Sequence, residues 1–174
     1  MGKDIMAEQV VLVDKNNTEL GVMEKLEAHE KGLLHRAFSI FIFNKKGELL
    51  LQQRNSSKYH SGGLWSNTVC SHPRPEEKYE DAVHRRLQEE MGFDCELHKL
   101  SCIIYKAKFE NGLTEHEYDC VFRGKYDGDV YPDEIEVEEY KWVGIDELKA
   151  DMKKNPVIYT YWFKKIILHE NIIK

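Results

Sequence analysis

The segment Glu115-His116-Glu117 combines residue types and spacing that could do chemistry. It lies in a pattern typical of a β-strand, where side chains two positions apart point to the same face. We therefore expect Glu115, Glu117 and Asp119 to share one face. Neighbouring carboxylates repel each other unless solvent or a cation offsets their charge. The segment alone is compatible with a cation site and equally with a solvated strand edge.

Three histidines elsewhere in the chain strengthen the cation interpretation. His29 and His35 precede the second predicted hairpin, and His72 follows Cys70 by two positions. Neutral imidazoles with carboxylates form a nitrogen and oxygen ligand set suited to Mn²⁺ or Mg²⁺, with Zn²⁺ possible. A single histidine is more often a surface or hydrogen-bonded residue than a ligand. Spacing alone does not determine whether the three converge.

Cys70 is the candidate reactive residue among the four cysteines, and it stands just before a predicted helix. A cysteine can act as nucleophile, acid or metal ligand where its neighbours tune its pKa, although a lone cysteine is usually an inert small side chain. Cys95, Cys102 and Cys120 lie in strand-like segments and are expected in the core. Because the chain has no CxxC pair, we expect reduced thiols rather than a disulfide framework.

Basic side chains near strand ends and on one helix could bind phosphate. Three lie at loop or strand edges: Lys25, Arg54 and Lys58. They fit either ordinary surface cations or the rim of a diphosphate pocket. Two arginine–glutamate pairs are spaced four residues apart on the predicted helix: Arg85 with Glu89, and Arg86 with Glu90. Ordinary pairing on a helix surface explains them, and a metal and phosphate platform is the alternative.

Apolar patterning predicts the elements that must position these side chains. Strands are expected near residues 10–13, 21–25, 36–43, 48–54, 102–109, 115–125 and 140–143, with three hairpins among them. Helices are expected at residues 76–91, where Gly92 supplies a stop, at 146–153 and at 159–169. The order shows no regular βαβ alternation or repeat. It predicts an α+β (mixed α/β) fold with a mixed sheet.

Composition limits the classes of protein. The 174 residues suit one domain, residues 1–174, and no apolar run reaches the roughly 18 to 20 residues of a membrane span. The first residues lack the apolar stretch of a secretory signal, so we expect a soluble cytoplasmic protein without a membrane partner. The net charge is −6 and no basic block is present, so nucleic acid is not an expected partner. The acidic run 133–139 is interpreted as solvated.

Taken in order, three motifs resemble a known family: LLHRAFS at 33–39, NTVCSHP at 67–73 and EHE at 115–117. Together they resemble type I isopentenyl diphosphate isomerase over residues 10–162. They lie in a degenerate Nudix box, in which Ser71 replaces a glycine and Arg86 replaces a glutamate. Nudix hydrolases generally gather their catalytic metals with those glutamates, so the second departure weighs against pyrophosphate hydrolysis.

The resemblance implies a Nudix-type fold and the reversible conversion of isopentenyl to dimethylallyl diphosphate in isoprenoid biosynthesis. It implies a proton-transfer pair, Cys70 and Glu117, on opposite faces of the substrate, assisted by Tyr105. One divalent ion (Mn²⁺, Mg²⁺ or Zn²⁺) would be held by His29, His35, His72, Glu115 and Glu117. A Mg²⁺ that bridges to the diphosphate would be held by Glu90. Further substrate contacts would come from Lys25, Arg54, Lys58, Arg86 and Trp162. From the residues alone, Trp162 and Tyr105 fit core and strand packing as well.

Two other functions remain open from the residues. Glu77, Glu89 and Glu90 also fit a Nudix hydrolase of a nucleoside diphosphate derivative. A metal-stabilised binding module without catalysis would use the histidines and carboxylates structurally, and its behaviour would not change on replacing Cys70. No oligomeric state is predicted.

Overall fold

Strand β3 (His35–Phe43) lies at the centre of the fold. Its sequence HRAFSIFIF is buried at all positions but Arg36, as expected for a strand that is covered on both faces. The computed structural model, which describes residues 8–168 and 172, pairs β3 in parallel with β8 (Thr114–Lys125) along its whole length. On the other side of β3 lies the short antiparallel strand β6 (Val69–Ser71). The sheet is therefore mixed, as predicted.

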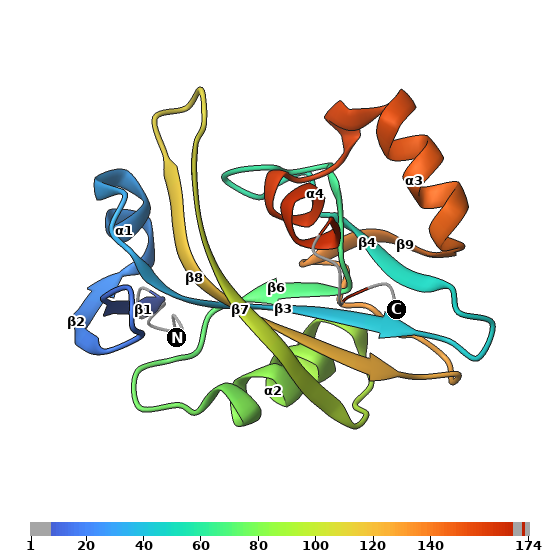
Figure 1. Ribbon diagram of the computed structural model, residues 1–174, viewed down its shortest axis with the longest axis horizontal. Coiled ribbons are helices and arrows are strands. Elements are labelled where there is room, and N and C mark those ends of the chain that lie inside the picture. The colour runs from blue at the N-terminus through green and yellow to red at the C-terminus, as the bar shows by residue number, and fades with distance from the viewer. Residues whose placement is uncertain (1–7, 169–171, 173–174) are drawn as a thin grey trace, which may run out of the picture.

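The remaining strands extend the sheet from β3 and β8. Strand β1 (Gln9–Val13) pairs with β2 (Glu19–Glu24) and meets β3 at its first residue. Strand β4 (Leu49–Arg54) pairs with β9 (Val137–Val143) and with β5 (Trp65–Ser66). Strand β7 (Leu97–Lys108) forms a long hairpin with β8, which curves away from the rest of the sheet (Figure 1).

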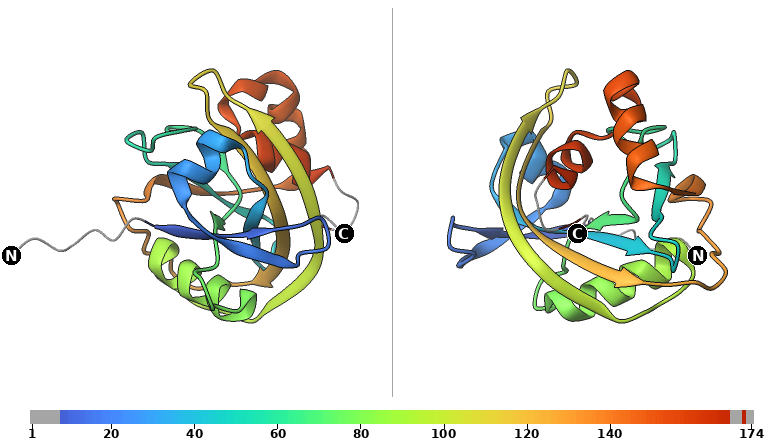
Figure 2. Two further views of the ribbon diagram at one scale, coloured as in Figure 1. Left: turned by 90° about the vertical axis from the view of Figure 1, so that its left-hand side faces the viewer. Right: turned by 45° about the vertical axis from the view of Figure 1, so that its right-hand side comes forward.

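Helices cover both faces of the sheet (Figure 1, Figure 2). Helix α2 (Tyr79–Met91) packs on one face against Phe38 and Ile40. Helices α3 (Ile145–Lys154) and α4 (Tyr161–Ile167), joined by the 3₁₀ turn Pro156–Ile158, pack on the other face around Phe41. Helix α1 (Lys25–Lys31) lies beside β8 at the far end of the sheet. No helix in the described part of the chain is long and apolar enough to cross a bilayer.

The sequence predicted most of the elements but missed helix α1 and strands β5 and β6. Helix α1 has only seven residues, and what fixes it is a cap at each end, the side chain of Glu24 and the left-handed Gly32. Strands β5 and β6 are shorter still, so Cys70 lies on a strand and not directly before a helix. Helix α2 begins at Tyr79 rather than at Glu76, whose φ of 66° is not helical.

Two further boundaries differ from the predictions. The strands β3 and β4 of a predicted hairpin pair only at Phe43 and Leu49. Beyond this point β3 pairs with β8 and β4 pairs with β9. Helix α4 ends at Ile167, and positions 169–171, where the last predicted helix would end, lie outside the described residues. Gly92 stops α2 as predicted: its φ is 74°, and a Cβ there would stand 2.2 Å from the carbonyl oxygen of Tyr131.

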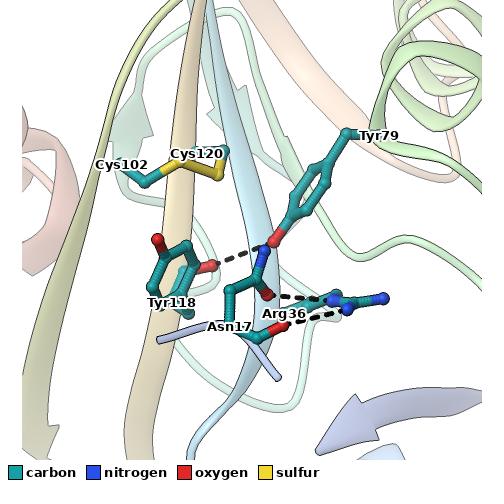
Figure 3. Close-up of a disulfide and its surroundings, with 6 residues drawn as sticks. All are labelled: Asn17, Arg36, Tyr79, Cys102, Tyr118 and Cys120. Carbon is teal, nitrogen blue, oxygen red and sulfur yellow. Dashed lines mark hydrogen bonds between the residues drawn. A yellow bond between two sulfur atoms is a disulfide. The ribbon is translucent and has the colours of Figure 1, made fainter. Parts of the chain in front are cut away.

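The prediction of reduced thiols is wrong for two of the four cysteines. Cys102 and Cys120 form a disulfide between β7 and β8, where they stand directly opposite each other (Figure 3). A signal was present in the sequence: each is nine residues from Asn111, at the predicted turn of this hairpin. Cys70 and Cys95 are free thiols. Cys95 lies before β7 rather than in a strand.

Candidate active site

The three alternating carboxylates of β8 are buried rather than solvated. Glu115, Glu117 and Asp119 are 3%, 6% and 1% exposed and point to one face of the strand, as predicted. Cys120 and Phe122 point the other way, into the core beneath α2. Burying three acidic side chains side by side is costly unless positive charge or hydrogen bonds compensate. This arrangement excludes the solvated-edge interpretation of the segment.

The three predicted histidines converge on these carboxylates from three different elements. His29 lies on α1, His35 begins β3 and His72 follows β6. One ligand atom from each of them and one from Glu117 lie within 4.8 Å of one another. The Nε2 atoms of His72 and His35 are 2.9 Å and 3.6 Å from Oε1 of Glu117. Nε2 of His29 is 3.6 Å from Oε1 of Glu115.

The outer hydrogen bonds of two imidazoles aim their free nitrogens at the cluster. Nδ1 of His29 donates to the carbonyl of Lys25 at 2.7 Å, and Nδ1 of His35 donates to the carbonyl of Leu33 at 2.8 Å. Carbonyls only accept, so Nε2 in each neutral ring carries a lone pair. Both Nε2 atoms, and Oε2 of Glu115, are buried without a hydrogen-bond partner among the described residues. Such a set of orphaned acceptors fits a divalent cation.

Cys70 lies on β6 opposite Ser39 and is held in a small polar network. Its thiol donates to Oδ1 of Asn67 at 3.0 Å, with the hydroxyls of Ser39 and Ser66 at 3.6 and 3.8 Å. Burial raises the pKa of Cys70 to about 12, and the nearby Asp119 carboxyl adds to the shift. The sulfur therefore stays protonated near neutral pH.

Cys70 and Glu117 flank β3 from opposite sides, one on β6 and the other on β8, and both line one cavity of about 230 Å³. The Tyr105 hydroxyl donates to Oε2 of Glu117 from the neighbouring strand β7. The indole of Trp162 on α4 lines the same cavity and donates to Oγ of Ser66 at 3.0 Å. The volume lies below the roughly 300 to 1,000 Å³ of sites for drug-sized ligands, so a small substrate fits.

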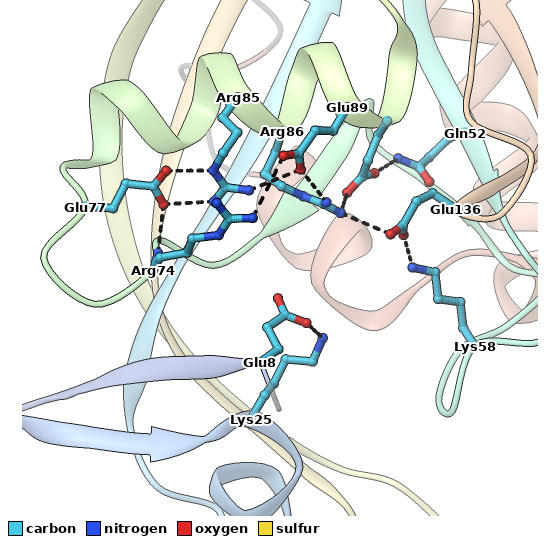
Figure 4. A network of polar contacts seen from close by, with 11 residues as sticks. Glu8, Lys25, Gln52, Lys58, Arg74, Glu77, Arg85, Arg86, Glu89 and Glu136 are labelled. Atoms are coloured by element: carbon cyan, nitrogen blue, oxygen red, sulfur yellow. Dashed lines mark hydrogen bonds and ion pairs between the residues drawn. The ribbon is translucent and has the colours of Figure 1, made fainter. Parts of the chain in front are cut away.

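Basic side chains line the mouth of this cavity, each beside a carboxylate (Figure 4). Lys25 pairs with Glu8, and Lys58 pairs with Glu136. Burial by itself would raise the pKa of Glu8, but Lys25 and other cations lower it to about 2. These ammonium groups already hold oxygen anions, which is the contact that a phosphate group would make.

Helix α2 contributes a second basic and acidic pair to the cavity. Arg86 pairs with Glu90, whose other oxygen accepts from Nε2 of Gln52 at 2.9 Å. Glu90 is 4% exposed, so this carboxylate is held in one position. Arg54 of β4 lies over the ring of Trp162, 5.1 Å from its centroid, and its Nε is buried with no hydrogen-bond partner in the described chain. Arg54 is thus available to an anionic ligand.

Comparison with known proteins decides the family. A profile of the NUDIX domain matches residues 33–163. Isopentenyl-diphosphate Delta-isomerase from Burkholderia multivorans is 52% identical, covering 93% of this chain and 92% of its own length. Isopentenyl-diphosphate Delta-isomerase 2 from Photorhabdus laumondii is 54% identical, with 93% and 92% covered. The chain belongs to this isomerase family of NUDIX-domain proteins. The resemblance found in the three sequence motifs is confirmed.

Solved structures confirm the NUDIX fold of this isomerase-family member. A crystal structure from Deinococcus radiodurans superposes with a TM-score of 0.75 at 17% identity, covering 92% of this chain and 98% of the other. A MutT NUDIX hydrolase from Burkholderia pseudomallei gives 0.61 at 21% identity, covering 76% and 94%. At such identities the likeness concerns the fold alone.

Two acidic residues of the NUDIX segment, one just before α2 and one on it, are bonded to arginines in this isomerase-family chain. Glu77 accepts two hydrogen bonds from Arg85, from Nε at 2.6 Å and from Nη2 at 2.8 Å. Glu89 accepts from Arg85 at 3.1 Å and from Arg86 at 2.8 Å. Figure 4 shows this line of ion pairs along α2. The two carboxylates therefore have fixed cationic partners and are not left for a metal ion.

The structure brings together the predicted site residues of the isomerase-family chain. Those that line the cavity are Lys25, Arg54, Lys58, Cys70, His72, Arg86, Glu90, Tyr105, Glu115, Glu117 and Trp162. His29 and His35 stand behind them in the imidazole cluster. The placement agrees with the predicted set, and the individual roles stay predictions.

Sequence reasoning missed several residues at this site. Glu136 belongs to the acidic run interpreted as solvated, yet it lines the cavity and contacts Lys58 and Arg86. Its position directly before the apolar Val137 of β9 was a weak signal. His60 and Glu8 also line the cavity, and nothing in their sequence neighbourhood indicated it. These two residues reach the cavity only through the tertiary structure.

Proposed function

We propose that the protein interconverts isopentenyl diphosphate and dimethylallyl diphosphate in isoprenoid biosynthesis, as a metal-dependent enzyme of one domain, residues 1–174. The names of its relatives support this reaction. The observation that carries the proposal for this chain is the placement of Cys70 and Glu117 in one cavity, on strands that flank β3 from opposite sides.

The reaction moves a double bond without changing the atoms of the substrate. A proton adds to the terminal alkene carbon and leaves a tertiary carbocation, and loss of a proton from the neighbouring carbon forms the new alkene. One group must give a proton while another accepts one. In our proposal these groups are the thiol of Cys70 and the carboxylate of Glu117, and their roles exchange with the direction of reaction.

The protonation of the two groups suits this division. Cys70 is partly buried, and its raised pKa keeps it a neutral thiol. Burial would raise the pKa of Glu117, but the neighbouring imidazoles of His35 and His72 hold it well below its usual range, so it is a carboxylate. The hydroxyl of Tyr105 bonds to Glu117, and in our proposal it carries a proton between that carboxylate and the substrate.

A divalent ion at the imidazole cluster would be held by His29, His35, His72, Glu115 and Glu117, in keeping with their orphaned nitrogens and oxygen. It would supply the positive charge that lets two buried carboxylates remain ionised together. Nitrogen and oxygen donors suit Mn²⁺, Mg²⁺ or Zn²⁺. We assign Glu90 to a Mg²⁺ that accompanies the diphosphate.

The remaining cavity residues would bind the substrate at its two ends. Lys25, Arg54, Lys58 and Arg86 surround the position proposed for the diphosphate. Trp162 also lines the cavity, and in our proposal its aromatic ring stabilises the carbocation. A desolvated cation over an indole gains about 2 kcal/mol or more. Exclusion of water by the bound substrate would also keep water from capturing the carbocation.

An assay in D₂O tests the proposal. Isopentenyl diphosphate and Mg²⁺ are incubated with the protein, and we expect dimethylallyl diphosphate together with deuterium in both isomers. The matched control is Cys95→Ala, which removes the other free thiol, outside the cavity, and should leave the rate unchanged. Release of phosphate without an isomerised product would instead support the NUDIX hydrolase alternative. Absence of both product and deuterium would reject the proposed reaction.

A further inference from the structure

His60 lies in the metal cluster although no motif pointed to it. It is 8% exposed, and its Nε2 is 3.0 Å from Oε1 of Glu115. Ligand atoms of His29, His60 and Glu115 lie within 4.8 Å of one another, in a second group that shares His29 with the first. The two groups could mark two ions or one.

The hydrogen bonding of His29 favours a single ion. Nδ1 of His29 is occupied by the carbonyl of Lys25, which leaves one lone pair, on Nε2. One lone pair binds one ion, so His29 cannot serve both groups separately. Without His29, the second group keeps only His60 and Glu115. Two donors are fewer than the three or more protein ligands of ordinary sites.

The distance to Glu115 and the packing of the ring are compatible with His60 as a ligand of the ion that Glu115 would bind. Adjacent donors around an octahedral ion stand about 3 Å apart when the bonds are about 2.1 Å long. The Nε2 of His60 keeps this separation from Glu115. Its ring is stacked on Phe109 at 10° with centroids 5.6 Å apart, and meets Trp162 edge-on at 5.9 Å. The ring is therefore held in place.

We propose that His60 is a sixth protein ligand of the divalent ion in the His/Glu site and that it excludes coordinated water from this ion. The inference deepens the metal assignment of the proposed function and rests on it. Four imidazoles and two carboxylates supply six donors, which closes the shell of an octahedral ion. An ion with a closed shell has no open position for the substrate, so its role would be to hold Glu115 and Glu117 in place.

His60 is also expected to be the weakest of the four imidazole ligands. His29 and His35 each donate Nδ1 to a backbone carbonyl, whereas Nδ1 of His60 is buried without a hydrogen-bond partner among the described residues. Second-shell hydrogen bonds of this kind typically raise metal affinity roughly 10- to 100-fold. Losing His60 should therefore weaken the binding of the ion without abolishing it.

Water-proton relaxation of Mn²⁺-loaded protein tests this inference. Mn²⁺ is added below one equivalent and without diphosphate, so that the tightest site fills first. We expect little relaxation enhancement in the wild type, and a clear increase in His60→Phe, because water enters the vacated position. Chelator competition should show Mn²⁺ bound roughly tenfold more weakly. His60→Phe retains an aromatic ring, and His60→Gln retains a hydrogen-bond donor to Glu115.

The outcomes separate the possible roles of His60. His98→Phe changes an exposed histidine of β7 and should match the wild type in relaxation and affinity. Equal relaxation in wild type and His60→Phe, with Mn²⁺ bound in both, would overturn the inference while the proposed reaction stands. A wild type that binds no Mn²⁺ would overturn the inference and the metal assignment together. Isomerase activity, measured separately, can fail without affecting the relaxation result.

Discussion

Carboxylates gather in two regions of this protein, and their partners differ. In the helix region, Glu77 just before α2 and Glu89 on it are bonded to the guanidinium groups of arginines. On β8, Glu115 and Glu117 face imidazoles, several of whose nitrogens lack hydrogen-bond partners in the described chain. The arginines stay charged at every physiological pH, whereas a neutral imidazole offers a lone pair.

The difference indicates how a NUDIX fold can carry another chemistry. Guanidinium groups neutralise Glu77 and Glu89, so a metal ion has little to gain at these two carboxylates. The negative charge of the strand carboxylates is not compensated by a permanent cation, and a bound metal ion can compensate it. Arg86 stands between the regions, because it pairs with Glu89 and Glu90 on α2 and lines the cavity. In our proposal, the His/Glu metal site therefore lies on the strand face rather than at Glu77 and Glu89.

The largest expected effect contrasts the proposed proton-transfer groups with the helix. Cys70→Ala and Glu117→Gln should each lower turnover by at least roughly 10²-fold, since a positioned acid or base contributes about 10²- to 10⁴-fold. Glu89→Gln should remain within about fivefold of wild type, because an exposed ion pair contributes at most about 1 kcal/mol. Steady-state assays with isopentenyl diphosphate measure all three. Comparable losses for Glu89→Gln and Glu117→Gln would remove the distinction.

Metal removal provides the next largest contrast. Mn²⁺ or Zn²⁺ at about 100 times its dissociation constant should stabilise the folded protein by about 2.7 kcal/mol, which raises Tm by roughly 5 to 11 °C. Scanning calorimetry with and without chelator measures this shift. Glu115→Gln should abolish most of it, and Glu77→Gln should leave it intact. A shift that disappears only in Glu77→Gln would place the ion on α2.

A substitution of Glu90 tests a carboxylate that belongs to both regions, because it lies on α2 and lines the cavity. It is buried beside Arg86 and accepts from Gln52, yet it lines the cavity. Glu90→Gln should raise the Mg²⁺ concentration needed for half-maximal rate by at least roughly tenfold, since metal sites lose about that much when a supporting group is removed. Titration of the rate with Mg²⁺ measures it. Glu77→Gln serves as the control and should keep the wild-type requirement.

Much of this site could be predicted because its residues lie in local patterns. The alternation of β8 placed Glu115 and Glu117 on one face, and three short motifs identified Cys70 and His72 as members of one set. Residues that join the site only through tertiary structure were missed. His60 reaches Glu115 from a loop, and Glu136 meets Lys58 across the cavity mouth. Neither contact leaves a periodic or local trace in the sequence.

The fold shows the same division. Long, periodic segments such as α2 and the β7–β8 hairpin were predicted, although their ends shifted by a few residues. The parallel pairing of β3 with β8 joins segments about 80 residues apart, and no local pattern specifies it. Yet this pairing sets His35 beside Glu117 and so assembles the cluster. The chemistry of the site depends on the least predictable contact of the sheet.

The smallest effect expected concerns the pH dependence of the helix region. Hydrogen bonds from Arg85 lower the pKa of Glu77 in the folded protein. A carboxyl with a depressed folded pKa contributes stability above its unfolded pKa of about 4.3, and that contribution is lost as pH falls through the folded value. Glu77→Gln should therefore cost about 1 kcal/mol at pH 7 and progressively less below about pH 4.

Urea unfolding of wild type and Glu77→Gln at a series of pH values measures this difference, with chelator present so that the strand cluster holds no ion. A constant difference from neutral to acid pH would mean that Glu77 acts through packing rather than through its charge. In the expected result, the stability contributed by the helix region depends on pH and not on metal. The stability contributed by the strand region should instead depend on metal, because its carboxylates have no permanent cation of their own.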